Sequence, residues 1–216
     1  MRWDSLFDDL ESQLENELSA EEGQLRAEEE RLRLGRLSIR DRLTALAGEP
    51  DRTAHSRQSW RDGAAVLRLE LRSQAVVLVR PRTFGKDWLA GELLAAGERR
   101  PQCVIPLGAV ASVLLDRADI RASLLQQPVP PARLADRIGL PFVLRDLCRR
   151  RAAIELDCGA RDLDGATRAL TGTIDRVGRD HCDIALHEAS VPRRESSVAG
   201  YRIVPFEQIM LLRMAE

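Results

Sequence analysis

Residues 172–187 read G-T-I-D-R-V-G-R-D-H-C-D-I-A-L-H, and they decide the fold that we expect. Apolar residues lie on both sides of the triplet Gly178-Arg179-Asp180, and a further apolar stretch follows at Val204-Pro205-Phe206. Two strands around a tight, glycine-containing turn are typical of a β-hairpin, in which Gly178 can take the positive φ that other residues resist. This stretch has no evident catalytic pattern. The sequence therefore predicts an architecture more directly than an activity.

An earlier part of the chain carries similar features in the same order. Gly85-Lys86-Asp87 precedes Gly178-Arg179-Asp180 by 93 residues, and each triplet follows an apolar residue. The other matched segments are Ile39-Arg40-Asp41 with Leu144-Arg145-Asp146, Leu69-Glu70-Leu71 with Ile154-Glu155-Leu156, and Ile105-Pro106 with Val204-Pro205. The order indicates two copies of one β module, each led by a short helix. A chance likeness between short apolar strands is the alternative.

The second copy resembles an Sm-like domain in three segments. These are a leading helix near Leu144 to Arg150, the G-x-I-x-x-V run at 172–177 and the V-P-x-x-x-I run at 204–209. A module of about 70 residues with roughly five bent strands also has the size of such an SH3-like barrel. The resemblance implies an α+β, mainly β fold with two tandem Sm-like barrels, an N-terminal helix and a helical connector. We expect domains at 1–34, 36–115, 116–143 and 144–216.

The chain departs from the Sm pattern where that family binds RNA. Gly178 follows Val177 where the family has an acidic residue, Cys182-Asp183 replaces an expected asparagine, and residues 199–202 only loosely match the second motif. Ring assembly and uridine binding are therefore not carried over. The whole chain also resembles a bacterial family often labelled Fis-type transcriptional regulator, but it lacks a Fis-like C-terminal recognition helix, and function must be argued from a site.

An acidic amphipathic helix is predicted for residues 1–34. Its apolar positions fall at steps of four, three, four and four and then of seven, which makes a narrow seam: Trp3, Phe7, Leu10, Leu14, Leu18, Leu25 and Leu32. Gly23 and a possible capping box at Ser19 and Glu22 leave one helix or two open. The seam either packs on the chain's own later domain or forms a dimeric coiled coil. Four arginines face eleven acidic residues here, a net charge of −7, so residues 35–216 carry +6.

The connector is basic and helical. Three short helices are predicted, at residues 119–126, 132–138 and 141–151. Residues 117–151 hold eight arginines against three aspartates. The cluster Arg149, Arg150 and Arg151 is a candidate contact for phosphates or for an acidic partner such as the N-terminal helix. Arg57, Trp60 and Arg61 form a second weak candidate, because an exposed tryptophan between arginines can stack on bases. The plainer interpretation is that the arginine cluster forms a solvent-exposed face and that Trp60 folds back on the first barrel.

No reaction chemistry is indicated. His181, Asp183 and His187 alternate onto one face of a strand, where an exposed polar face is a better interpretation than a metal site. Cys103, Cys148, Cys158 and Cys182 are widely spaced, so we expect four reduced, mostly buried thiols. There is no phosphate-binding loop, nucleophile elbow or dinucleotide motif. We expect no catalytic residues, no cofactor and no metal.

These features predict a cytoplasmic, non-enzymatic binding, adaptor or regulatory protein. It would act through protein contacts and through self-association by the N-terminal helix. No apolar run approaches the length of a membrane span, and the acidic N-terminus does not resemble a secretory signal. The alternative is a regulator that binds RNA or DNA through the basic connector. A catalytic or metal-dependent protein is a third class.

Overall fold

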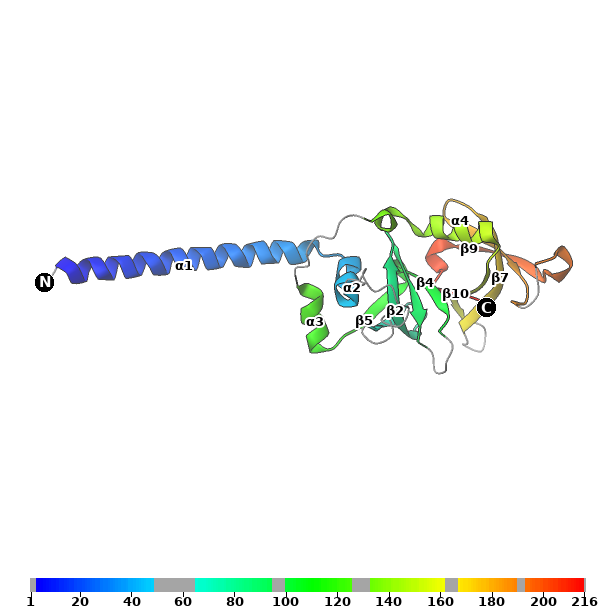
Figure 1. The fold of residues 1–216 in the computed structure, drawn as a ribbon, viewed down its shortest axis with the longest axis horizontal. Helices are drawn as coiled ribbons and strands as arrows, with labels where there is room; N and C mark the ends of the chain where they lie inside the picture. Colours follow the sequence, from blue (N-terminus) through cyan, green and yellow to red (C-terminus); the bar gives the residue numbers. More distant parts are fainter. Residues whose placement is uncertain are drawn as a thin grey trace, which may run out of the picture. The chain divides into compact units, whose positions relative to one another are not determined.

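The computed structural model describes residues 3–48, 65–94, 100–125, 133–161, 167–189 and 193–215. The chain divides into two compact units between Ser38 and Ile39. The first unit consists of one helix, α1 (Trp3–Arg36), so the sequence alternative of two consecutive helices is not adopted. The second unit contains all the described strands (Figure 1).

The second unit combines helices with a large sheet. Its α-helices are α2 (Ile39–Ala47), α3 (Arg117–Leu124) and α4 (Leu140–Arg150). Its strands are β1 (Leu67–Leu71), β2 (Val76–Phe84), β3 (Trp88–Leu93), β4 (Gln102–Pro106), β5 (Val110–Leu114), β6 (Ala153–Arg161), β7 (Thr167–Val177), β8 (His181–Leu186), β9 (Gly200–Pro205) and β10 (Leu211–Met214). Short 3-10 helices are η1 (Leu107–Ala109), η2 (Leu134–Arg137), η3 (Glu195–Ser197) and η4 (Phe206–Gln208). The fold is α+β and mainly β, as the sequence predicts.

The strands form one continuous antiparallel sheet. Its order is β5-β1-β2-β3-β4-β10-β6-β7-β8-β9, so β5 and β9 are its two outer strands. The sheet is not closed, because within the described part of the chain β5 pairs with β1 alone and β9 with β8 alone. The two modules expected from the sequence are therefore joined in a single sheet through β4 and β10.

The two halves of this sheet have the same strand order. The first half runs β5-β1-β2-β3-β4 and the second runs β10-β6-β7-β8-β9. Their register also agrees, because Phe84 pairs with Leu89 and Val177 pairs with Cys182, each 93 residues later. A β-bulge interrupts β2 between Pro81 and Thr83, and another interrupts β7 at the positions 93 residues on. A bulge is a specific feature of the backbone, so its recurrence strengthens the case for a repeat.

The register corrects two of the matches expected from the sequence. Leu69 pairs with Val113 and Leu156 pairs with Leu212, so Leu156 and not Ile154 is the counterpart of Leu69. A slip of two residues leaves a strand's alternation unchanged, and the sequence pattern therefore did not detect it. The match between the two leading helices is also shifted. Their fully buried leucines, Leu43 and Leu144, are 101 residues apart, whereas the match expected from the sequence assumed a separation of 105 residues. Four residues are about one helical turn, which preserves an amphipathic pattern.

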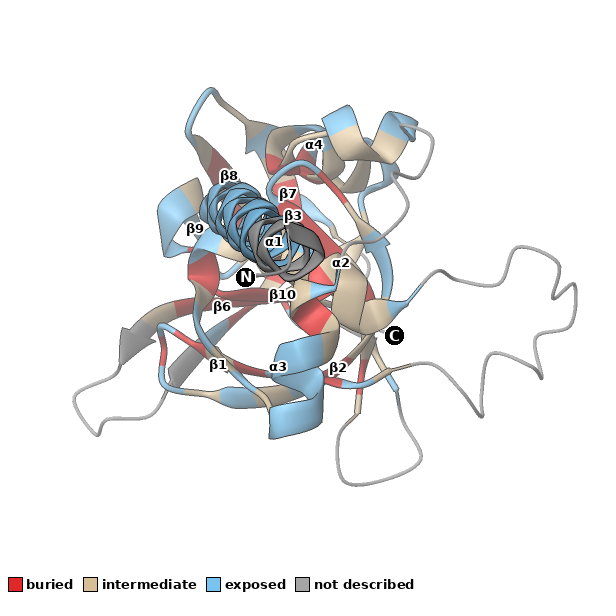
Figure 2. Cartoon of the chain, turned by 90° about the vertical axis from the view of Figure 1, so that its left-hand side faces the viewer, coloured by how far each residue is buried: buried red, intermediate tan, exposed pale blue. Residues whose placement is uncertain are grey.

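Two hydrophobic clusters fill the second unit, and both cross the boundary between its halves. Trp88 and Val104 of the first half belong to the cluster built mainly from β6 to β9 and α4. Met210 and Leu211 of the second half belong to the cluster built from α2 and β1 to β5. Figure 2 shows the buried residues gathered along the strands. The halves therefore share their cores.

The connector matches its prediction in position and in part of its structure. Helix α3 begins two residues before the predicted segment 119–126, with Asp116 as its N-cap through a 2.8 Å bond from the Asp119 N–H. The predicted helix at 132–138 is the 3-10 helix η2, and residues 126–132 lie outside the described residues. Helix α4 agrees with the prediction to within one residue at each end.

Candidate interaction surfaces

The apolar seam of α1 is exposed. Leu14, Leu18, Leu25 and Leu32 each expose more than half of their surface. Trp3, Phe7 and Leu10 lie on the same helix, but their side chains are outside the described part of the structure. An isolated helix gains little stability from propensity alone and normally buries an apolar stripe against a partner. The seam is therefore a candidate contact surface.

Ion pairs line the flanks of this seam. Glu22 with Arg26, Glu28 with Arg31 and Glu30 with Arg33 are each three or four residues apart. The hydrogen bond from Arg33 lowers the pKa of the Glu30 carboxyl, and the same bond raises the pKa of Arg33. Exposed pairs of this kind contribute little to stability, so they support the helix without determining its partner.

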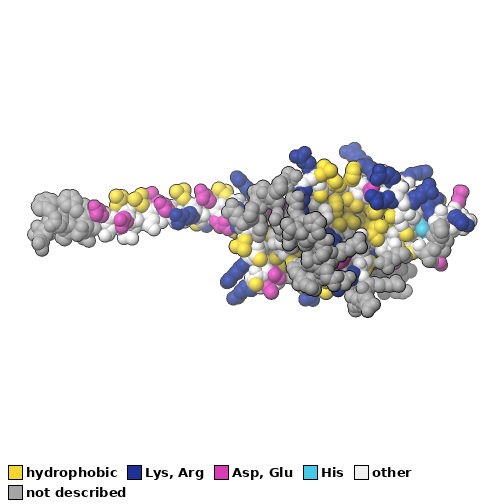
Figure 3. Space-filling view, viewed as in Figure 1, with side chains coloured by type: hydrophobic (Ala, Val, Ile, Leu, Met, Phe, Trp, Pro, Cys, Tyr) yellow, Lys and Arg dark blue, Asp and Glu magenta, His cyan; other side chains and the backbone are white. Residues whose placement is uncertain are grey.

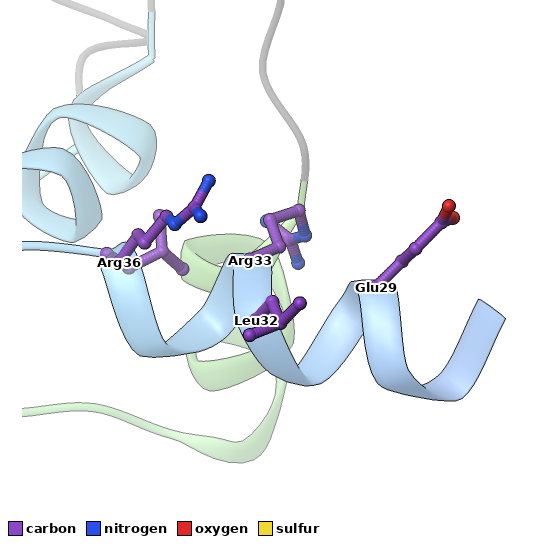
Figure 4. A pocket seen from close by; sticks show the side chains of 5 residues that line it. Glu29, Leu32, Arg33 and Arg36 are labelled. Carbon is purple, nitrogen blue, oxygen red and sulfur yellow. The ribbon is translucent and has the colours of Figure 1, made fainter. Parts of the chain in front are cut away.

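A shallow hollow lies at the C-terminal end of α1. Glu29, Leu32, Arg33, Arg36 and Leu37 line it, and Figure 4 shows Leu32 between the charged side chains. The lining mixes one acid, two bases and two leucines from a single stretch of chain. This mixture does not define a ligand, but it extends the seam to the end of the helix.

The predicted arginine cluster lies at the C-terminal end of α4, where Figure 3 shows Lys and Arg side chains gathering. Arg149 and Arg150 both pair with Asp146, at 2.5 Å and 2.7 Å. Desolvation acts to raise the pKa of Asp146, but the hydrogen bond and charge of Arg149 and the charge of Arg150 outweigh it and lower that pKa. Arg151 takes a left-handed conformation that ends the helix. Asp146 therefore offsets part of the cluster's positive charge.

The second predicted contact, Arg57, Trp60 and Arg61, lies outside the described residues. The structure therefore does not place this candidate.

The glycine of each matched turn lies against an aromatic ring. Gly178 is not among the described glycines with positive φ, so the predicted reason for a glycine there is wrong. A Cβ on Gly178 would instead lie 2.6 Å from the His181 ring, and a Cβ on Gly85 would lie 2.2 Å from the Trp88 ring. In each turn an aromatic ring three residues later covers the glycine.

The first turn joins the two halves of the second unit. Asp87 accepts the Leu140 N–H at 2.8 Å and so caps α4 from 53 residues away. Trp88 Nε1–H donates to the Ile138 carbonyl at 2.9 Å, and the Lys86 N–H donates to the same carbonyl. Beside these contacts, β4 pairs with β10. We call this group of contacts the junction.

The second turn makes no such contact within the described residues. Asp180 Oδ1 lies 2.8 Å from His181 Nδ1, and this hydrogen bond lowers the pKa of Asp180. The predicted polar face of β8 is only partly exposed, because His187 is buried and follows the end of the strand. Its Nδ1 lies 2.8 Å from the Glu188 carbonyl, and its Nε2 lies 3.4 Å from Thr173 Oγ1. The exposed face expected at His187 is therefore wrong.

The cysteines are free thiols, as predicted, and Cys103, Cys158 and Cys182 are buried. Burial raises the pKa of Cys103 and of Cys158 to about 11 and that of Cys182 to about 12. Thiols with such high pKa values react poorly as nucleophiles at neutral pH.

Two searches of the described residues have negative results. No group of three or more His, Cys, Asp or Glu side chains is placed to hold a metal ion. No helix in the described part of the chain combines the length and apolar character needed to cross a membrane.

Comparisons with protein-family models, with curated proteins and with solved structures find no match to this chain.

Proposed function

We propose that this chain is a non-enzymatic adaptor or regulatory protein built on two tandem Sm-like barrels, and that it acts by binding protein. It associates with itself through the seam of α1. The proposal places the protein in the cytoplasm, and the four free thiols fit a reducing compartment.

Three features support the Sm-like assignment. Each half begins with a short helix, α2 or α4. Each half then has five antiparallel strands in the order fifth-first-second-third-fourth. Each half also joins its last two strands through a 3-10 helix, η1 or η4. The shared sheet is a departure from two separate barrels, and the β4–β10 pairing is its cause.

The exposed leucine seam is the observation that carries self-association. Leu18, Leu25 and Leu32 are spaced by seven residues, which is the heptad spacing of a coiled coil. Two such helices bury both seams when they pair, and acidic and basic residues three or four apart remain at the flanks. A second copy of α1 offers the matching surface directly.

The test replaces two seam leucines with glutamate. We expect the L18E/L25E variant to have half the mass of the native protein in solution at equal concentration, because charge prevents burial of the seam. The A20E/A27E variant is the control, since it adds equal charge on the other side of α1. Light scattering after size exclusion measures both masses. An unchanged mass in L18E/L25E would remove α1 from the proposal.

Binding to nucleic acid is the second candidate, and the exposed side chains of Arg149 and Arg150 favour it. Phosphate contacts release counterions, so binding would weaken steeply with salt, whereas seam contacts would change little. The measurement is binding to mixed single-stranded RNA and to duplex DNA across a salt series. Tight binding that the R149A/R150A/R151A variant loses would make nucleic acid the main partner. Absence of binding at low salt would leave protein contacts.

A further inference from the structure

The charges of α1 are divided unequally along its length. Residues 11–22 contain five glutamates and no basic residue, a net charge of −5. Residues 23–36 contain four arginines and three glutamates, a net charge of +1. Two copies of α1 can therefore pair with their acidic halves together, or with the acidic half of each copy beside the basic half of the other.

The glutamates of the acidic half are poorly neutralised by their own helix. Oppositely charged side chains on one helix meet when they are three or four residues apart. Glu11, Glu15, Glu17 and Glu21 have no lysine or arginine within four residues on either side. Within the described part of α1, the ion pairs begin at Glu22. The acidic half therefore presents unneutralised charge to whatever binds the seam.

Two glutamates also lie on the face of the seam. Glu21 comes three residues after Leu18 and four before Leu25. Glu29 comes four residues after Leu25 and three before Leu32. Residues at these steps share one face of a helix. A parallel pair in register would place each of these glutamates beside the same glutamate of the other copy, which brings like charges together in a contact that excludes water.

An antiparallel pair avoids this repulsion. The register that overlaps the seams places Leu14 of one copy level with Leu25 of the other. Glu21 then lies level with Leu18 of the other copy, and no longer beside a second Glu21. The apolar contact between the helices is kept, and like charges are separated along it.

The same register brings opposite charges together. Arg26 of one copy lies level with residue 13 of the other, which is between Glu11 and Glu15. A two-fold symmetric pair contains this contact twice. Complementary charge of this kind fixes the orientation and register of an interface more than its affinity.

We propose that two copies of this chain pair through α1 in antiparallel orientation, with Leu14 of one copy beside Leu25 of the other. The proposal rests on the self-association proposed above and specifies its geometry. A helix of 34 residues is about 51 Å long. The second unit follows the C-terminal end of α1 in the chain, so an antiparallel pair carries its two second units at opposite ends of the paired helices. Such a dimer bridges two separate partner molecules or two distant sites on one partner, whereas a parallel dimer would present both second units at one end.

Cysteine crosslinking tests the orientation. The parent chain carries C148S, because Cys148 is the only native cysteine that is not buried. The raised pKa values of Cys103, Cys158 and Cys182 keep these thiols unreactive. We expect a mixture of L14C and L25C chains, combined under reducing conditions, to form an intermolecular disulfide under mild oxidation.

Each of these chains alone should form no such disulfide. In the antiparallel pair the two copies of residue 14 are eleven residues apart in level, which is roughly 16 Å along the helix and beyond the reach of a disulfide. A dimeric protein in which L14C crosslinks with itself would overturn the antiparallel orientation, and so would a dimeric protein without the mixed crosslink. Both results would leave self-association in place. A parent chain that is monomeric by light scattering would instead remove self-association, and this inference with it.

A charge reversal gives a second readout whose sign depends on the orientation. E11K/E15K changes the net charge of residues 11–22 from −5 to −1. In the antiparallel pair the new lysines lie beside Arg26 of the other copy, so the dissociation constant should rise by roughly tenfold at low ionic strength and by less at high salt. In a parallel pair the same change would relieve repulsion between the acidic halves, and the dissociation constant would fall.

The matched control is S12K/N16K, which adds two lysines with the same spacing on the side of α1 that faces away from the seam. We expect it to change the dissociation constant much less than E11K/E15K does. Sedimentation equilibrium at two salt concentrations measures all three proteins. A dissociation constant that falls or stays the same in E11K/E15K would overturn the antiparallel arrangement.

Discussion

At the scale of single residues, the two covered glycines show how the repeat has diverged. Gly85 lies under Trp88, whose ring is buried and whose Nε1–H is bonded to the Ile138 carbonyl. Gly178 lies under His181, whose ring is partly exposed and is bonded through Nδ1 to the exposed Asp180 carboxylate. The matched glycine therefore lies under a buried ring in one half and under a partly exposed ring in the other.

We expect G85A to destabilise the protein more than G178A does. A new Cβ at Gly85 meets a ring that is held by burial and by a hydrogen bond, so the expected cost is about 1–3 kcal/mol. At Gly178 the partly exposed His181 ring can turn outward by giving up its solvent-exposed bond to Asp180, and a cost below roughly 1 kcal/mol is expected. Urea unfolding of both variants measures the difference. Equal losses of stability would contradict the idea that ring mobility decides the cost.

At the scale of elements, the cap of α4 is the most consequential single contact. Asp87 comes from the turn before β3 and caps a helix of the other half, whereas Asp116 caps α3 from the adjacent position in the chain. The two caps have the same bond length, 2.8 Å, and the same chemistry. The Asp87 cap connects a turn of the first half to a helix of the second half, whereas the Asp116 cap connects α3 only to the residue directly before it.

We expect D87A to lower the free energy of unfolding by about 1–2 kcal/mol and to loosen the start of α4, because the Leu140 N–H loses the carboxylate that accepts it. D116A is the matched control and should cost about 1 kcal/mol while affecting α3 alone. Hydrogen exchange of α3 and α4 distinguishes the two effects. D87N should keep most of the stability, since an asparagine is also a good N-cap. Unchanged exchange in α4 of D87A would exclude the capping role.

The elements also show what the sequence can and cannot predict. The alternation at 67–71 and the turn at 85–87 depend on neighbouring residues, and both features are read directly from the sequence. The cap from Asp87 and the pairing of Val104 with Leu212 join residues 53 and 108 positions apart, which no local pattern encodes. The repeat itself was visible, but its register was ambiguous by two residues in β6 and by one turn in α4.

The candidate surfaces also differ in how far the sequence predicts them. The α1 seam was predicted from spacing, and the exposure of Leu14, Leu18, Leu25 and Leu32 fits that prediction. The outer strands β5 and β9 were not singled out, because an edge is defined by which strand pairs with which. A signal was present in Tyr201 and Ile203, two large apolar residues on β9 that are both exposed.

At the scale of the whole second unit, shared cores predict that its two halves unfold together. Leu211 belongs to the second half by sequence, and its backbone pairs with Asp157 of β6. Its side chain is fully buried in the cluster of α2 and β1 to β5. A change at Leu211 therefore removes apolar contacts from the first half and leaves the sequence of that half unaltered.

We expect L211A to lower the free energy of unfolding by about 2–5 kcal/mol, the range for a leucine deleted from a packed core. Hydrogen exchange should accelerate in β1 to β3 and in β6 to β8 by the same factor, because one cooperative transition exposes both halves. V76A is the control, since Val76 is exposed on β2 and should change stability by less than about 0.5 kcal/mol. Faster exchange confined to one half would mean that the halves unfold separately despite their shared cores.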